Sequence, residues 1–343
     1  MTNDNGSLLD LTIIIFSRDR HRELSKTIRY YESIGVNLLV LHRSSEQIAI
    51  DPASELLTYV FTNLSFAQRC IEIKNLVTTH YVIMASDDER YLPSTLKIMV
   101  SELERNIELN SIGGQALALK KYGFRNAATW NFSNLKSYEN FSDDYSVRLN
   151  DHFGKFVMGV RIGSLYRMYR FNEFCTLMDI FGNLESIQTP YIYECTAEIF
   201  AIWIGRFRYI NNLFWIRNWN VPMITTKDWN RKLTFSRWLK DDLYSKEVSE
   251  WKELMSLKLS MELSTLESTL LLLCDNRCTL DSKIDSSFVK PNLKVNDYVK
   301  FLFRFFFLNK TLPNNRETTL QQLKDNGISV NIDEFNRAAK SMG

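Results

Sequence analysis

The sequence predicts an α/β fold with a mostly parallel sheet flanked by helices. Short apolar, β-branched runs alternate with segments whose apolar residues recur every three or four positions, from residue 11 to about residue 107. The connections between these segments are short, and glycine or proline marks several of their boundaries. Such alternation places parallel strands side by side, with the connecting helices on the faces of the sheet.

The first unit is a strand, a helix and a second strand. Residues 11–16 read Leu-Thr-Ile-Ile-Ile-Phe, which predicts a strand buried on both faces, and the polar segment 17–20 follows it as a loop. The apolar positions of the next segment have helical spacing: Leu24, Ile28 and Tyr31. Gly35 ends this helix, because glycine readily adopts the left-handed conformation that terminates helices. Residues 36–41 predict the second strand.

The same order then repeats. Residues 59–62 and 81–84 predict two further strands. One face of the helix between them is formed by Phe66, Cys70, Ile73 and Val77. Pro93 suits the first turn of another helix, where its missing N–H is tolerated. The apolar positions of that helix are Leu92, Leu96, Met99, Leu103 and Ile107. Residues 111–119 predict one more strand.

The second half of the chain is less regular. Residues 120–165 are rich in Asn, Ser, Tyr and Asp and have little periodicity, which predicts a long loop region of the kind that often carries function. Residues 191–205 predict a helix, and residues 209–218 predict a strand. The pattern of residues 231–310 is helical.

Composition and charge exclude several classes of partner and site. The formal net charge is +2, which is too small for the basic surface that nucleic acids require, so we expect no nucleic-acid partner. The cysteines are odd in number and scattered, which is typical of reduced thiols. Cys274 and Cys278 have no second Cys or His pair near them, so we expect no zinc site. Without a signal-peptide pattern or an apolar stretch of 18 residues, we expect a cytoplasmic protein.

Three consecutive acids follow the predicted strand 81–84. In an extended segment, alternate side chains point the same way, so Asp87 and Glu89 would share one side and Asp88 would face the other. One side would bind a ribose, and the other a Mn²⁺ or Mg²⁺ ion that holds a nucleoside diphosphate, because hard cations prefer oxygen ligands. The alternative is that these acids cap the helix that begins near Leu92. Three acids exceed what one cap requires.

These segments resemble the GT-A glycosyltransferases, in particular the family-2-like bacterial enzymes of polysaccharide biosynthesis. The resemblance rests on "LTIIIFSRDRHRELSKTIRYY" and "NLSFAQRCIEIKNLVTTHYVIMASDDERYLP", and more weakly on "YIYECTAEIFAIWIGRFRYINNLFWIRN". It implies the GT-A fold, a nucleotide-sugar donor, a divalent metal and a glycan or lipid-linked glycan acceptor. The expected parts are a nucleotide-sugar-binding core at 1–120, an acceptor-side part at 121–230 and a C-terminal helical region at 231–343.

The resemblance also implies roles for single residues. Those expected to bind the nucleotide are Ser17, Arg18, Asp19, Arg69, Asp87 and Asp88, and those expected to hold the metal are Asp87 and Glu89. Arginine suits phosphate, although an arginine on a helix is usually solvated. The sequence departs from the family pattern at Glu89, where the family generally has Asp. Glutamate still ligates metals, at a different reach.

An inverting transfer needs a carboxylate that takes the proton of the acceptor hydroxyl. Glu194 and Glu198 are four residues apart on the predicted helix 191–205, so they share one face and are the first candidates. The alternative is a structural role, in which one of the two pairs with Arg206 or Arg208 and the other is exposed to solvent. Asp151, in the predicted loop region, is the third candidate.

Two broader questions stay open at the sequence level. Residues 298–310 combine aromatic and basic side chains, which suits either peripheral contact with the inner face of the membrane or a buried helix. The rival functions are a non-catalytic scaffold that binds glycan or a partner, and a sugar nucleotidyltransferase. The second lacks the Gly-rich phosphate loop that it would need after Phe16. The sequence does not predict the donor sugar, the acceptor or the oligomeric state.

Overall fold

The computed structural model describes most of the chain. The described residues are 7–45, 54–122, 125–129, 138–155, 167–185, 190–218, 235–271, 316–325 and 327–342. Among them, no helix is both long enough and apolar enough to cross a membrane. The segment 298–310 and the pair Cys274 and Cys278 lie outside the described residues.

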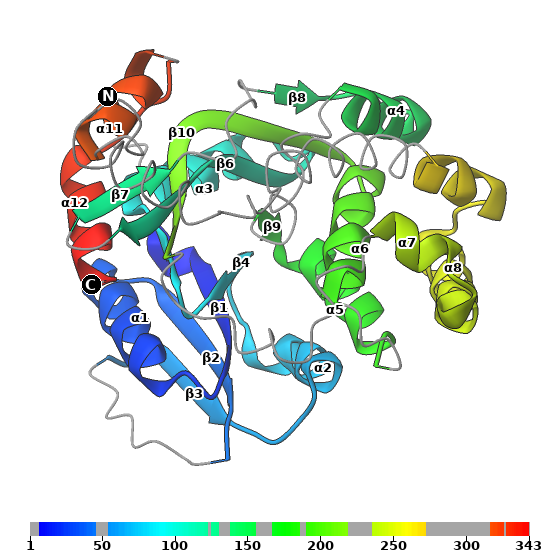
Figure 1. Cartoon of the computed structure of the whole chain (residues 1–343), viewed down its shortest axis with the longest axis horizontal. Coiled ribbons are helices and arrows are strands. Elements are labelled where there is room, and N and C mark those ends of the chain that lie inside the picture. Colours follow the sequence, from blue (N-terminus) through cyan, green and yellow to red (C-terminus); the bar gives the residue numbers. More distant parts are fainter. Residues whose placement is uncertain are drawn as a thin grey trace, which may run out of the picture.

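The core of the molecule is one twisted sheet (Figure 1). Its strands are β1 (Leu11–Arg18), β2 (Asn37–Arg43), β3 (Leu57–Phe61), β4 (Tyr81–Ser86), β5 (Glu89–Tyr91), β6 (Leu109–Tyr122), β7 (Arg125–Thr129), β8 (Tyr138–Asn140), β9 (Met168–Arg170) and β10 (Arg206–Asn218). The main path runs β3-β2-β1-β4-β9-β6-β10-β5, with β7 paired to β6 and β8 paired to β10.

The sheet is mixed. The pairs β2–β3, β1–β2, β1–β4 and β6–β10 are parallel. The short strand β9 runs antiparallel between β4 and β6, and β5 pairs antiparallel with the last residues of β10. The carboxyl ends of β1, β2 and β4 therefore lie at one edge, and β5 brings the chain that leaves β4 alongside the end of β10. Ligands of open α/β sheets bind at such an edge.

Helices cover both faces of the sheet. They are α1 (His21–Ile34), α2 (Phe66–Leu76), α3 (Pro93–Arg105), α4 (Tyr145–Lys155), α5 (Phe171–Gly182), α6 (Pro190–Trp203), α7 (Phe235–Lys240), α8 (Ser245–Leu259), α11 (Arg316–Asp325) and α12 (Ile332–Ser341), with the short 3-10 helices η1 (Leu8–Asp10) and η3 (Asp242–Tyr244). Strand β1 shows the two faces. Ile14 packs with α2, α5 and α6, whereas Ile13 and Ile15 pack with α1, α3 and α12. Burial on both sides explains its unbroken apolar run.

The C-terminal helices form two groups. Helices α7 and α8 extend from α5 and α6 at one end of the molecule. Helix α12 lies beside α1, and α11 lies beside β7, so the last described residues return to the sheet at its other end (Figure 1). Ser329 joins this group to the sheet through backbone hydrogen bonds with Asn211 and Leu213 of β10.

The predicted strands and helices of the first half are confirmed, with small shifts of their ends. Helix α1 ends at Gly35, which has φ of 68°. Helix α3 begins at Pro93 but ends at Arg105, so Ile107 lies beyond it and is 84% exposed. The expected helix 191–205 and strand 209–218 are α6 and β10.

The loop predicted for residues 120–165 is wrong in part, because β7, β8 and α4 lie within it. Over residues 145–152, where the burial of α4 is described, the buried positions are Arg148, Leu149 and His152. Two of these three are polar, so the helix shows no apolar periodicity. Helix α5 and strand β9 were not predicted at all.

Candidate functional site

The acidic run forms a tight turn at the carboxyl end of β4. Asp87 and Asp88 make the turn, and Glu89 begins β5. The expectation that Asp87 and Glu89 share one side of an extended segment is therefore wrong, since the chain reverses between them. All three side chains are buried, with exposures of 2%, 5% and 0%. Burial of three adjacent carboxylates requires compensating positive charge or hydrogen bonds.

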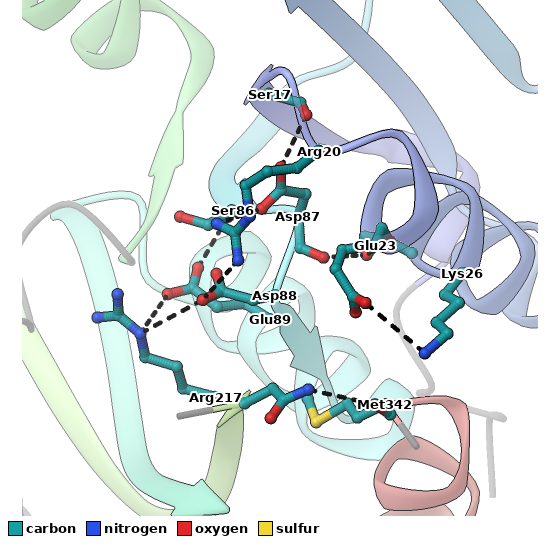
Figure 2. A network of polar contacts seen from close by, with 12 residues as sticks. Ser17, Arg20, Glu23, Lys26, Ser86, Asp87, Asp88, Glu89, Arg217 and Met342 are labelled. Atoms are coloured by element: carbon teal, nitrogen blue, oxygen red, sulfur yellow. Dashed lines mark hydrogen bonds and ion pairs between the residues drawn. The ribbon is translucent and has the colours of Figure 1, made fainter. Parts of the chain in front are cut away.

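The end of β1 and the loop that follows it supply part of this compensation (Figure 2). The hydroxyl of Ser17 donates to Asp87 Oδ2 at 2.7 Å. The guanidinium of Arg20 lies 2.7 Å from Asp87 Oδ1 and 3.3 Å from Asp88 Oδ2. Arg20 thus bridges the two carboxylates of the turn.

The end of β10 supplies the rest. Nε of Arg217 lies 3.9 Å from one oxygen of Asp88 and 3.9 Å from one oxygen of Glu89. The other oxygen of Glu89 accepts a hydrogen bond of 2.8 Å from the N–H of Ser86. Figure 2 shows Arg20 and Arg217 on either side of the acidic turn.

Three carboxylates lie close together in this cluster, beside the guanidinium groups of Arg20 and Arg217, and the buried Arg90 also interacts with Asp88. Burial raises the pKa of Asp87 to about 6, while Arg20 opposes that rise. The charge of Asp88 also raises the pKa of Asp87, so the two carboxylates repel one another, and a bound cation would relieve that repulsion.

The backbone of the turn is held by hydrogen bonds from three elements, α1, β5 and β10. The hydroxyl of Thr27 in α1 donates to the carbonyl of Asp87. The N–H of Asn218, at the end of β10, donates to the carbonyl of Asp88 at 2.9 Å. The carbonyl of Glu89 accepts from Arg90 of β5 at 2.7 Å. It also accepts from Tyr31 of α1 at 3.3 Å.

Arg90 connects the turn to the C-terminal helix. Its side chain is 1% exposed. One guanidinium nitrogen donates to Thr27 Oγ1 at 2.7 Å, and Nε donates to the hydroxyl of Ser341 in α12 at 2.9 Å. The side-chain amide of Asn218 donates to the carbonyl of Met342 at 3.2 Å. Residues at both ends of the chain therefore support the same turn.

The acidic turn offers carboxylate oxygens, which are the ligands that hard divalent cations prefer. Asp88 Oδ1 is buried and has no hydrogen-bond partner among the described residues, so it is the oxygen best placed to bind a cation. Both oxygens of Asp87 already contact Ser17 or Arg20. No group of three or more His, Cys, Asp or Glu side chains in the described part of the chain is arranged to hold a metal by itself. A metal here would take further ligands from a bound diphosphate.

Arg69 lies beneath the loop instead of being solvated. It is 5% exposed and donates to the carbonyls of Leu41 at 2.8 Å and Ser17 at 3.3 Å, at the ends of β2 and β1. Burial lowers the pKa of its guanidinium to about 10. Arg18, the last residue of β1, and Asp19, which follows it, are exposed, with 3.5 Å between Arg18 Nε and Asp19 Oδ2. Asp19 has φ of 51°, so the loop turns sharply there.

The candidate bases lie on two helices. Glu194 is in the first part of α6, and its side chain lies outside the described part of the structure; Asp151 is in α4 and is partly exposed. Glu198 is 1% exposed, and one of its oxygens contacts His152 and, at 3.3 Å, Arg167. Burial and these two partners favour a structural role for Glu198, and Glu194, Glu198 and Asp151 all stay predictions as the base. In the described part of the structure, Arg206 pairs with Glu108 and Asp143, and Arg208 pairs with Glu102.

Three residues of the site were missed in the sequence. Arg20 belongs to the polar segment 17–20, so the signal for it was present. Arg217 is at the end of a predicted strand, and its position beside the acidic turn depends on β5 reversing direction. No sequence pattern indicates Thr27, because nothing local distinguishes it from any other threonine on a helix.

The comparisons with known proteins identify the fold. No family model and no curated protein matches this sequence. Staphylococcus aureus TarS 1–349 in complex with UDP-GlcNAc superposes with a TM-score of 0.50 at 10% identity, covering 82% of this chain and 77% of that chain. TarS is a GT-A-like glycosyltransferase. This chain has the GT-A fold. Within this GT-A fold, the acidic turn lies where the resemblance placed the acidic motif, at the end of β4.

Another TarS 1–349 structure superposes with a TM-score of 0.46 at 10% identity, covering 86% of this chain and 79% of that chain.

Proposed function

We propose that this protein is a glycosyltransferase that moves a sugar from a nucleotide-diphosphate sugar to a glycan or glycolipid acceptor in surface polysaccharide synthesis. One observation carries the proposal: a GT-A sheet presents Asp87, Asp88 and Glu89 in a buried turn flanked by Arg20 and Arg217. Carboxylates beside arginines suit a metal–diphosphate group, since the acids attract the cation and the arginines attract the phosphates.

The parts of the site have separate tasks in this reaction. Asp88, supported by Asp87 and Glu89, would hold Mn²⁺ or Mg²⁺, which would stabilise the charge that develops on the leaving diphosphate. Ser17, Arg18 and Asp19 would border the nucleoside. Because the superposed TarS structure contains UDP-GlcNAc, UDP-sugars are the first donors to test.

The decisive experiment measures release of UDP from UDP-GlcNAc and other nucleotide sugars, with Mn²⁺ or with chelator. Asp88→Asn should lower metal-stimulated release by at least about a hundredfold, because it removes the charge that binds the metal, by analogy with the loss of one key charge-stabilising group. Glu72→Gln is the control, since Glu72 is exposed on α2. Full activity in chelator would contradict metal assistance. Binding of glycan without any release of nucleotide would favour the non-catalytic scaffold.

We assign proton transfer to Glu194 and expect inversion at the anomeric carbon. A base acts only when the acceptor hydroxyl attacks, so its loss should reduce turnover more than donor binding. Glu194→Gln should lower kcat by about a hundredfold or more while the Kd for UDP stays constant. Nearly normal turnover would move the role to Asp151. Retention of anomeric configuration would remove the need for such a base.

A further inference from the structure

Arg20 has more hydrogen-bonding capacity than its contacts use. It is the N-cap residue of α1, and its side chain lies over the acidic turn with 17% exposure. One of its nitrogens is 2.7 Å from Asp87, but Nε and the nitrogen that lies 3.3 Å from Asp88 are buried and make no hydrogen bond within the described residues. A guanidinium has five N–H groups. Several donors of Arg20 are therefore unused.

Arg20 and a divalent cation need the same carboxylates. Asp88 presents Oδ2 to Arg20 and has Oδ1 without a hydrogen-bond partner. A metal bound to Oδ1 would thus share one carboxylate group with a fixed positive charge. Like charges at such separations repel strongly in a buried site, because little water screens them. Arg20 therefore opposes metal binding as long as it stays on the turn.

A bound diphosphate would offer Arg20 a second partner. The planar fork of arginine matches two phosphate oxygens, and its unused nitrogens are already beside the turn. The N-terminus of α1 lies at the same place, and the side chain of its N-cap residue, Arg20, makes no capping hydrogen bond. Helix N-termini also attract anions, because their free N–H groups carry partial positive charge.

We infer that Arg20 is an internal counter-cation that exchanges partners: it holds Asp87 and Asp88 in the nucleotide-free protein, and it transfers to a phosphate of the nucleoside diphosphate when a divalent cation takes the carboxylates. The second half rests on the proposed function, whereas the first half concerns the cation alone. Donor and metal should therefore bind cooperatively, since each weakens the contact of Arg20 with the two carboxylates, and that contact hinders the binding of the other ligand.

Two titrations with effects of opposite sign test this exchange. Mn²⁺ binding to the nucleotide-free protein is followed by electron paramagnetic resonance, and UDP binding at saturating Mn²⁺ is followed by calorimetry. Arg20→Gln should lower the Kd for Mn²⁺ by about tenfold and raise the Kd for UDP by about tenfold. Arg22→Gln is the matched control, because Arg22 carries the same charge two residues later and is exposed. It should change neither constant.

The result separates the exchange from simpler roles. A purely structural arginine would weaken both ligands when removed, and a purely neutralising one would leave UDP binding unchanged; either outcome overturns the inference. Arg20→Lys keeps the charge and loses the fork, so it should weaken UDP binding while Mn²⁺ binding stays near the wild-type value. The Mn²⁺ arm needs no sugar transfer. If the proposed function fails, nucleotide sugars will not turn over, but the tighter Mn²⁺ binding of Arg20→Gln will persist.

Discussion

Arg69 shows how a buried charge positions a loop. Its guanidinium joins the carbonyl of Ser17 to that of Leu41, so it fixes the ends of β1 and β2 relative to α2. It also lies over the ring of Phe16, with 5.4 Å between the guanidinium carbon and the ring centroid. Ser17 in turn holds Asp87. The contact with the nucleotide that the sequence suggested for Arg69 stays a prediction, but the structure adds an indirect route from Arg69 to the acidic turn.

Arg69→Ala should therefore lower the free energy of unfolding, by about 2 kcal/mol, because two carbonyls lose a charged donor. Arg69→Lys should recover only part of this, since an ammonium group is more strongly hydrated and cannot also supply the guanidinium Nε that donates to the carbonyl of Ser65 at 3.4 Å. Urea denaturation measures the loss, and a UDP titration in the same variants measures the effect on Ser17. Equal unfolding midpoints for wild type and Arg69→Ala would contradict the positioning role.

Among secondary-structure elements, α1 is the closest support of the acidic turn. Thr27 donates to the carbonyl of Asp87 and accepts from Arg90, so one hydroxyl joins α1, the turn and β5. Thr95 of α3 is a useful comparison. It is also buried, and its hydroxyl donates to the carbonyl of Leu213 at 2.8 Å, away from the turn.

Thr27→Val and Thr95→Val should each lower the free energy of unfolding by about 1–2 kcal/mol, because each leaves a buried carbonyl without that donor. Only Thr27→Val should raise the Kd for UDP, by about threefold or more, since only Thr27 fixes the turn. Denaturation and calorimetry on the same preparations give both values. A similar change of Kd in the two variants would show that the effect is one of general stability.

A second buried cluster joins α4, α6 and β10. His152 contacts Glu198, Arg167 pairs with Glu198 at 3.3 Å, and Arg167 also donates to the hydroxyl of Tyr209 at 3.1 Å. Burial lowers the pKa of His152, and the charge of Arg167 lowers it further, although Glu198 acts in the opposite direction. In the folded protein, His152 thus takes up a proton less readily than an unfolded histidine does.

The stability contributed at this position is present above pH 6.5 and decreases as the pH falls below it, because the unfolded chain then binds the extra proton. The free energy of unfolding should therefore be lower at pH 5.5 than at pH 7.5. His152→Gln should lack this part of the pH dependence. Urea denaturation at both pH values measures it, and identical slopes for the two proteins would show that His152 does not contribute.

Local patterns predicted the elements that obey a simple burial rule. Strand β1 is buried on both faces and reads as an unbroken apolar run, and α1 has one apolar face with glycine at its end. Helix α4 could not be found in this way, because Arg148 and His152 occupy its buried face and are satisfied by distant groups. The carbonyl of Ile202 accepts from Arg148, which is a partner that only the fold supplies.

The same limit applies to the site. The acidic run and the polar segment after β1 were visible in the sequence, because both follow buried strands. Their geometry was not, since the reversal at Asp87 and Asp88 depends on β5 pairing with the end of β10. That pairing also brings Arg217 to the turn. Contacts between residues more than a hundred positions apart leave no local pattern.

At the scale of the whole molecule, α12 completes the support of the acidic turn. Phe335 is fully buried against the core that contains α1 and α3. Glu334 accepts from the N–H of Ser94 at 3.0 Å and from its hydroxyl at 2.7 Å, so it stabilises the first turn of α3. Ser341 then reaches Arg90. Docking of this helix is therefore coupled to the order of the turn.

Phe335→Ala should lower the free energy of unfolding by about 3–5 kcal/mol and should also weaken UDP binding, because α12 loses its apolar anchor. Met255→Ala is the matched control, since Met255 is fully buried in α8, among the helices at the other end of the molecule. It should cost about 2–5 kcal/mol and leave the Kd for UDP unchanged. Equal Kd values for the two variants would separate α12 from the site.

The link from Arg90 to Ser341 also sets an order of events during translation. The two residues are 251 positions apart. Ribosomes add about 5–20 residues per second, so roughly 10–50 seconds pass between the synthesis of Arg90 and that of Ser341. During that interval, Arg90 and the three acids of the turn lack the contacts that α12 makes in the folded protein. The nascent protein therefore acquires its complete acidic turn only after residues 327–342 have left the ribosome.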